Sequence, residues 1–223
     1  MRGCGLRITL SMPIPAPLPP APVIDRPLVR GFLPWLGATL LRLAGWKVVL
    51  AQPVPARCVG IFYPHTSNWD TVIGLCAKFM FGIRFRYVGK DTLFRVPLIG
   101  PLLVRWGGVP VNRREPSGFI RQMQSEFARN EEFRLAIAPE GTRSRTAHWK
   151  SGFYRLARAA GVPLALAYAD YPRREIGIGG YLELTGDVAA DMARIRAFYA
   201  DKRGRHPENQ GPVRLRDESA ADG

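Results

Sequence analysis

Short apolar runs alternate with longer segments of helical periodicity through most of this 223-residue chain, and this alternation constrains the fold more than any other feature. The runs at 58–63, 133–138 and 162–168 are almost continuously apolar, as expected for strands buried on both faces of a sheet. Strands that alternate with helices indicate layers packed around one sheet. We therefore predict an α/β fold, a single sandwich domain in which helices flank a central mixed sheet.

The other elements follow from the same patterns. Further strands are expected at 47–51, 84–88 and 109–111. Helices are expected at 32–46, 68–81, 116–130, 151–161 and 187–202. Gly179 and Gly180 lie between two strand-like segments, 175–178 and 181–184, and a glycine pair suits a two-residue turn, which predicts a hairpin there.

The two ends of the chain differ in composition from the 47–203 segment, which holds the predicted domain. Residues 1–27 contain seven of the twenty prolines, and alternating prolines favour polyproline-like backbone over helix or central strand. We predict that this leader is disordered. Residues 204–223 are polar and balanced in charge, so we predict a frayed polar C-terminal tail.

Residues 28–46 are nearly all apolar from position 32 onward and are expected to form a short helix. Trp35 and Trp46 are eleven residues apart and would share one face of a continuous helix, with Arg30 and Lys47 flanking it. This pattern fits a helix that lies in a membrane interface. A buried core helix fits a length of about 15 residues equally well. No uninterrupted apolar run reaches the length of a conventional membrane-spanning helix.

The formal net charge is +14, and residues 31–112 hold nine basic residues but only two acids. Such a field attracts polyanions, which include nucleic acid, an anionic bilayer and phosphorylated substrates, and composition does not choose among them. An arginine-rich solvated surface is the alternative. Cys4, Cys58 and Cys76 show no CxxC spacing, which argues against a disulfide scaffold or a thiolate zinc site.

The most informative stretch follows a buried strand and contains His65 and Asp70. Functional side chains of α/β sheets tend to emerge where such strands end. On a continuous helix the two side chains would point about 140° apart, so they can meet only if His65 lies in a loop and Asp70 folds back. A carboxylate on Nδ1 would then leave Nε2 free to accept a proton from a hydroxyl. A loop histidine that is merely held by a capping aspartate is the alternative interpretation.

Two further stretches contain residues suited to anion binding. Gly141 can adopt a positive φ, and Thr142, nearby backbone amides and Arg143 could bind a phosphate. A simple turn with solvated arginines would have the same sequence. Gly107, the first of a glycine pair, leads into a short strand that delivers Arg113.

Taken in order, these motifs resemble those of the glycerolipid acyltransferase family, typified by 1-acylglycerol-3-phosphate acyltransferases. The matching segments are His65-x4-Asp70, Gly107-x5-Arg113, Glu140-Gly141-Thr142-Arg143 and Val162-Pro163. Lys90 resembles the lysine of the family's Lys-x-x-Leu segment. The resemblance covers about residues 30–200, with a proline-rich leader in place of a long hydrophobic anchor.

The resemblance implies transfer of a fatty acyl group from a thioester carrier to the free hydroxyl of a lysophospholipid, above all 1-acylglycerol 3-phosphate, giving phosphatidic acid. His65 would be the general base, and Asp70 would orient it. The acceptor phosphate would bind in a pocket formed by Lys90, Arg113, Glu140, Gly141, Thr142 and Arg143. No metal and no cofactor would be needed, with acyl-CoA or acyl-carrier protein as co-substrate.

The implied partners are a phospholipid membrane surface, the lysophospholipid acceptor, and acyl-CoA or an acidic acyl-carrier protein. Nucleic acid is not expected, because the chain lacks a recognised nucleic-acid-binding motif. The expected location is the cytoplasmic face of the inner membrane, as a peripheral or monotopic protein. Three alternatives stay open: glycerol 3-phosphate as acceptor, a lyso-ornithine lipid as acceptor, or a non-catalytic basic module that binds lipid or nucleic acid.

Overall fold

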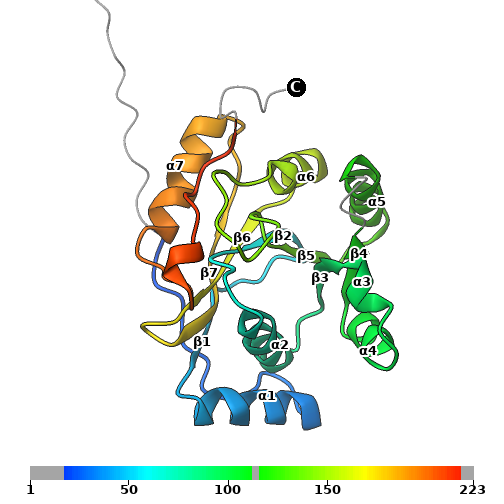
Figure 1. The fold of residues 1–223 in the computed structure, drawn as a ribbon, viewed down its shortest axis with the longest axis vertical. Helices are drawn as coiled ribbons and strands as arrows, with labels where there is room; N and C mark the ends of the chain where they lie inside the picture. The colour runs from blue at the N-terminus through cyan, green and yellow to red at the C-terminus, as the bar shows by residue number, and fades with distance from the viewer. Residues whose placement is uncertain (1–17, 112–115, 217–223) are drawn as a thin grey trace, which may run out of the picture.

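The computed structural model describes residues 18–111 and 116–216. Within them, seven strands form one mixed sheet with helices on both of its faces (Figure 1), which confirms the predicted fold class. The order across the sheet is β1 (Lys47–Leu50), β7 (Glu175–Leu182), β6 (Leu164–Asp170), β2 (Arg57–Phe62), β5 (Phe133–Ile137), β3 (Phe85–Lys90) and β4 (Gly108–Val111). Neighbouring strands are parallel except β6 and β7, which are antiparallel.

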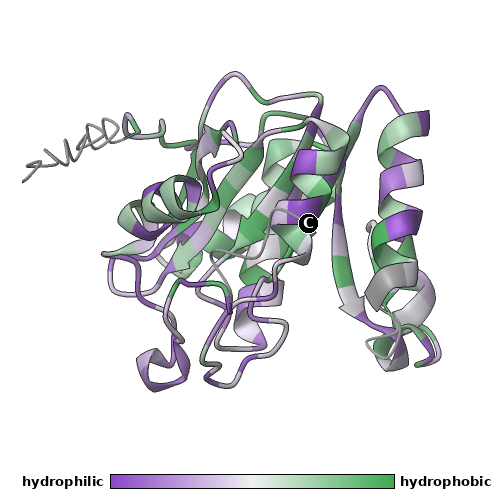
Figure 2. Cartoon of the chain, turned by 90° about the horizontal axis from the view of Figure 1, so that it is seen from above, coloured by the Kyte–Doolittle hydropathy of each residue, from purple (hydrophilic) through white to green (hydrophobic). Residues whose placement is uncertain are grey.

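The helices form two layers around this sheet. One layer consists of α1 (Phe32–Leu43) and α2 (Trp69–Phe81), and the opposite layer of α5 (Pro116–Arg129), α6 (Gly152–Ala160) and α7 (Val188–Tyr199). Two short helices that the sequence did not predict, α3 (Asp91–Phe94) and α4 (Ile99–Arg105), connect β3 to β4, and a 3-10 turn, η1 (Pro207–Asn209), lies near the C-terminus. Figure 2 shows hydrophobic residues concentrated on the strands between the layers.

Side-chain size differs between the two faces of the central strand β6. Leu164 and Leu166 belong to the hydrophobic core shared with α5, α6 and α7. Ala165 and Ala167 alternate with them and face the core that includes α1 and α2. Because alanine side chains are short, this second face leaves space between α2 and the sheet.

The predicted turn at Gly179 and Gly180 is wrong, because β7 runs through both glycines and the chain turns at residues 171–174 instead. A Cβ on Gly179 would lie 2.6 Å from a ring carbon of Phe198 on α7. This glycine therefore allows a close approach of α7 to the sheet and does not reverse the chain.

The described part of the N-terminal leader does not match the prediction of disorder. Residues 18–27 are described and lie beside the sheet, where Val23 forms an antiparallel bridge with Val49 and the Ile24 amide donates to the Val48 carbonyl at 2.7 Å. This pairing covers hydrogen-bonding groups of the edge strand β1. The prediction of disorder for residues 1–17 lies outside the described residues.

The C-terminal segment is not a frayed tail over residues 204–216. Leu215 is buried, with 4% of its surface exposed, and its backbone bridges to that of the buried Trp149. The prediction was wrong because it used the mean composition of residues 204–223, which is polar and does not show that single side chains such as Leu215 pack against the domain. Residues 217–223 lie outside the described part of the chain.

The helix predicted over 32–46 ends at Leu43, so Trp46 does not belong to it and the two tryptophans do not share a helical face. Trp35 is exposed on α1. Trp46 packs edge-on against Tyr171, with the ring centroids 5.0 Å apart.

One face of α1 packs closely on α2. A Cβ on Gly37 would lie 2.7 Å from the carbonyl oxygen of Cys76, so a small residue is needed at this contact. Gly37, Ala38 and Leu41 are the buried residues of α1. None of the helices in the described ranges is long and apolar enough to cross a membrane.

Candidate active site

His65 lies in the loop between β2 and α2, and Asp70 occupies the first turn of α2. The Asp70 carboxylate folds back toward the loop, as pairing of the two side chains requires, and its Oδ2 lies 3.1 Å from His65 Nδ1. An ionised carboxylate only accepts hydrogen bonds, so Nδ1 carries the proton and Nε2 keeps a free lone pair. Among the described residues, His65 Nε2 has no hydrogen-bond partner.

Asp70 is almost fully buried, yet its carboxylate has several donors. Oδ2 also accepts the backbone amides of Thr66 at 2.8 Å and Ser67 at 2.9 Å, and Oδ1 accepts the hydroxyl of Tyr171 at 2.7 Å. Burial acts to raise the pKa of Asp70, but the hydrogen bonds from His65, Tyr171 and Ser67 outweigh it and hold this pKa below its ordinary value. The carboxylate therefore stays ionised beside the imidazole.

Tyr171 is a site residue that the sequence analysis missed. It follows β6, which neighbours β2 in the sheet, so both Tyr171 and His65 lie just beyond carboxyl ends of parallel strands. Burial raises its pKa, and the nearby Asp70 carboxylate raises it further, so the phenol remains a hydrogen-bond donor. The position after a buried strand was the available signal, but no motif marked it.

Glu140 is a second buried carboxyl group at the same edge, in the loop after β5. It accepts the backbone amide of His65 at 2.9 Å and that of Gly211 at 3.5 Å. Burial raises the pKa of Glu140 to about 7, and the charge of Asp70 acts in the same direction. Glu140 thus joins the loop that carries His65 to the C-terminal segment through main-chain contacts.

The predicted phosphate-binding residues are distributed along the same edge of the sheet. Gly141 has a φ of +67°, and the Thr142 hydroxyl accepts the Ser144 amide at 3.3 Å. Arg143 and Lys90 are exposed, Lys90 at the carboxyl end of β3, and no hydrogen bond links either side chain to His65 or Asp70 in the described ranges. The remaining predicted residue, at position 113, lies outside the described residues.

An apolar cavity of about 180 Å³ begins at His65 and Asp70 and extends between α2 and the sheet. Its sheet side is lined partly by small residues, namely Gly60, Ala136, Ala138, Ala165 and Ala167, and partly by larger ones such as Phe62, Tyr87 and Ile137. On its α2 side lie Gly74 and the half-buried Lys78, whose Nζ donates to the Trp106 carbonyl at 2.6 Å. Periodicity had assigned these strand residues to the core alone, so the cavity was not predicted.

Comparison with known proteins shows the family to which the chain is related. A family model described as Acyltransferase matches residues 51–166, more than half of the chain. Over 131 residues the chain is 28% identical to a 1-acyl-sn-glycerol-3-phosphate acyltransferase of Borreliella burgdorferi. The match covers 56% of this chain and 51% of that relative, so the chain spans about half the length of the curated relative it matches.

No solved structure matches the chain. The extent of the family match, together with the relative from Borreliella burgdorferi, confirms the resemblance noted in the sequence. The chain belongs to the glycerolipid acyltransferase family.

Proposed function

We propose that this acyltransferase moves a fatty acyl group from acyl-CoA or acyl-carrier protein to the free hydroxyl of 1-acylglycerol 3-phosphate, giving phosphatidic acid. The observation that carries the proposal is the His65–Asp70 pair, 3.1 Å apart, at the mouth of an apolar cavity. A base at the end of a space suited to an acyl chain is what direct acyl transfer to a lipid hydroxyl requires.

In the proposed reaction, His65 Nε2 takes the proton of the acceptor hydroxyl as its oxygen attacks the thioester carbonyl. The oxygen–carbon ester bond forms, the carbon–sulfur bond breaks, and the imidazolium returns the proton to the departing thiolate. Asp70 holds the imidazole in the required tautomer and stabilises the imidazolium while it exists. No covalent acyl-enzyme is needed, because the activated hydroxyl attacks the thioester directly.

The cavity is suited to the acyl chain of the donor. Its lining is apolar, and small residues such as Gly60 and Ala165 keep the sheet side open. Burying a methylene group in such a space contributes about 0.8 kcal/mol, which favours a long chain over a short one. An acyl chain seated there would bring its thioester carbonyl to the His65 end.

The acceptor phosphate is assigned to cations beyond the carboxyl ends of β5 and β3. Arg143 follows β5 and Lys90 ends β3, and the predicted partner at position 113 follows β4. Guanidinium groups suit phosphate because they offer paired donors in a plane. Glu140 fixes the start of the loop that carries Arg143, since its carboxyl group accepts the main-chain amides of His65 and Gly211.

We also propose that α1 binds the cytoplasmic membrane surface, so that the protein is peripheral or monotopic. Its outer face carries Phe32, Trp35, Leu40 and Leu43, which are 69%, 59%, 47% and 81% exposed. Exposed apolar side chains of this size, with the buried face of the helix held by α2, are suited to shallow insertion at an interface. The positive charge of the chain adds attraction to anionic headgroups.

The proposed activity is tested with purified protein, a labelled acyl-thioester, and a panel of 1-acylglycerol 3-phosphate, glycerol 3-phosphate, lyso-ornithine lipid and monoacylglycerol. We expect phosphatidic acid to be the main product. His65→Ala should lower the rate about 10²–10⁴-fold, because it removes the general base. His148→Ala is the matched control, since His148 Nε2 instead accepts a hydrogen bond from Arg216 Nε at 3.2 Å. Near-wild-type transfer by His65→Ala, or equal use of monoacylglycerol, would contradict the proposal.

Tyr171→Phe should destabilise the protein without leaving a cavity. The change removes the hydroxyl that donates to Asp70 but retains the ring that packs beside Trp46. A hydrogen bond to a charged group contributes about 1.5–3 kcal/mol, so we expect the free energy of unfolding to fall by about that amount at pH 7. We expect kcat to fall while the KM for the acyl donor changes little.

The pH dependence of this loss of stability shows whether it arises from the charge of Asp70 or from a change in packing. The lowered pKa of Asp70 contributes stability that is present above the ordinary aspartate pKa, about 3.9, and lost as the pH falls through the folded-state value. The penalty of Tyr171→Phe should therefore be constant near neutral pH and shrink in acid. Urea unfolding at several pH values measures it, and an undiminished penalty in acid would refute the role assigned to the hydroxyl.

Gly74→Leu should shorten the acyl chains that the enzyme accepts. A Cβ at Gly74 would meet no atom within 4 Å, and the position lines the cavity, so a leucine there would fill cavity space. We expect transfer from a C16 donor to fall at least tenfold relative to a C8 donor. Gly118→Leu, at an equally open helical position on α5, is the control and should leave the C16-to-C8 ratio unchanged. An unchanged ratio in Gly74→Leu would contradict the assignment of the cavity.

Trp35→Ser combined with Leu43→Ser tests the membrane face of α1. Both side chains are exposed, so the folded domain should keep its melting temperature. We expect cosedimentation with anionic vesicles to fall at least tenfold, while transfer to detergent-dispersed acceptor remains. Unaltered vesicle binding would refute this role of α1.

A further inference from the structure

The C-terminal segment 203–211 packs directly on the loop between β2 and α2 that carries His65. The His206 amide donates to the Thr66 hydroxyl at 3.2 Å, and the Tyr63 hydroxyl donates to the Gly211 carbonyl at 2.6 Å. A Cβ on Gly204 would lie 2.6 Å from the same Thr66 hydroxyl oxygen. The segment therefore packs against the loop that carries His65.

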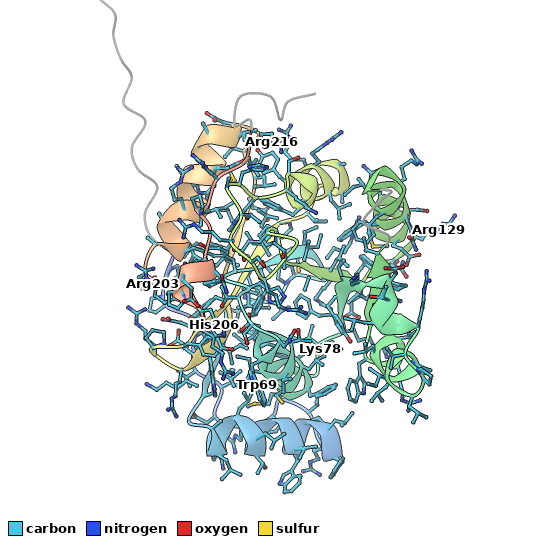
Figure 3. The ribbon with its side chains drawn as sticks, viewed as in Figure 1. Trp69, Lys78, Arg129, Arg203, His206 and Arg216 are labelled. Carbon is cyan, nitrogen blue, oxygen red and sulfur yellow. The ribbon has the colours of Figure 1, made fainter. Side chains whose placement is uncertain are left out.

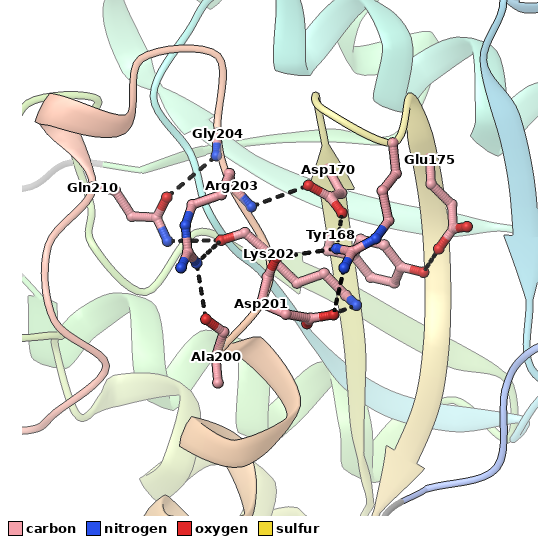
Figure 4. Close-up of polar contacts among 10 residues, drawn as sticks. Tyr168, Asp170, Glu175, Ala200, Asp201, Lys202, Arg203, Gly204 and Gln210 are labelled. Atoms are coloured by element: carbon pink, nitrogen blue, oxygen red, sulfur yellow. Dashed lines mark hydrogen bonds and ion pairs between the residues drawn. The ribbon is translucent and has the colours of Figure 1, made fainter.

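Hydrogen bonds within the segment and to its neighbours fix its backbone (Figure 4). The Arg203 amide donates to Asp170 at 3.2 Å, and the Gln210 side chain bridges the segment by donating to the Lys202 carbonyl and accepting the Gly204 amide. Side chains carried by the segment are thus presented from a fixed backbone.

Arg205 is an exposed cation of this segment, whereas the guanidinium of Arg203 donates to the Ala200 and Lys202 carbonyls. Its guanidinium lies over the ring of Trp69, 5.6 Å from the centroid, and both residues are exposed. Among the described residues Arg205 has no ion pair, whereas nearby Arg173 pairs with Asp170 at 2.6 Å and with Asp201 at 3.2 Å. Arg205 thus combines an unneutralised charge with a side chain steadied by an aromatic platform.

The position of Arg205 differs from that of the cations assigned to the acceptor. Lys90 and Arg143 follow β3 and β5, on one side of β2 in the sheet. Tyr171 and the first residues of the docked segment lie on the other side, where the Arg203 amide bonds Asp170 of β6. The last residues of the segment reach back to the loop after β5, where Gly211 bonds Glu140. Figure 3 shows Trp69, Arg203 and His206 together on that side, with Arg129 at the opposite edge of the molecule. The positive charge of Arg205 also acts on the Tyr171 hydroxyl, which bonds Asp70, so it lies within electrostatic range of the site.

We propose that Arg205, on its Trp69 platform, binds a phosphate of the acyl donor, the one that ends the pantetheine arm of coenzyme A and of acyl-carrier protein alike. The proposal rests on the proposed function, because direct transfer requires donor and acceptor to be bound together on either side of His65. With the acceptor phosphate assigned to the β3 and β5 side, the second anionic substrate meets the cation on the β6 side. The exposed tryptophan offers a surface on which the arm can pack.

The test compares two donors that share one acyl chain. Palmitoyl-CoA carries the phosphate, and palmitoyl-pantetheine keeps the whole arm but ends in a hydroxyl. Arg205→Ala should raise the KM for palmitoyl-CoA about ten- to a hundredfold, the range of a lost charge-assisted contact, while the acceptor KM and the rate with palmitoyl-pantetheine stay unchanged. Arg205→Lys should raise the KM for palmitoyl-CoA less than Arg205→Ala does, because it keeps the charge. Arg129→Ala, which removes an equal charge far from the site, should leave this KM unchanged.

Calorimetric titration with coenzyme A gives a readout that does not depend on turnover. If coenzyme A binds and Arg205→Ala weakens it, the inference holds even where no lipid acceptor is acylated. If transfer proceeds and Arg205→Ala leaves the donor KM unchanged, raises only the acceptor KM, or slows both donors equally, the inference is wrong and the proposed function stands. Because Arg205 is exposed, its replacement should not alter the melting temperature, which is measured alongside.

Discussion

The burial of the Asp70 carboxylate is the constraint on which the site depends. An ionised carboxyl group removed from water is very costly unless hydrogen bonds replace its hydration. Here the replacements come from the loop amides of Thr66 and Ser67, from His65, and from Tyr171 in a distant turn. The loop, the start of α2 and the end of β6 must therefore assemble together. The orientation of the imidazole is a consequence of that requirement.

The sheet supplies the rest of the geometry. Parallel strands bring the loops after β2, β5, β3 and β6 to one edge, so residues far apart in the chain meet around His65. On one face of that sheet, large side chains fill the core against α5, α6 and α7. On the other face, alanines and Gly60 leave a cavity beneath α2 that begins at the same edge. One strand pattern thus accounts both for the packed core of the domain and for the cavity.

Much of this arrangement could be predicted from local sequence, because buried strands, their polar ends and the His65–Asp70 spacing are short-range patterns. The parts that were missed depend on long-range contacts. Tyr171 reaches Asp70 across 101 residues, and Gly211 reaches Glu140 across 71, and neither pairing has a local signature. The role of the glycine pair at 179–180 was ambiguous for a related reason. The pair alone is typical of a turn, and only the close approach of Phe198 to Gly179 explains a glycine within a strand.

The two buried carboxyl groups beside His65 have opposite pKa shifts, and their partners explain the difference. Asp70 bonds the imidazole, a phenol and two amides, which outweigh the effect of burial and keep it charged. Glu140 has two main-chain amides, one of them at 3.5 Å, and burial prevails, so its pKa rises to about 7. Two adjacent buried carboxylates would repel each other, and partial protonation of Glu140 relieves this repulsion near neutral pH. The charge is therefore concentrated on the carboxyl group that faces the imidazole, while Glu140 holds the loop that carries His65 against the docked C-terminal segment.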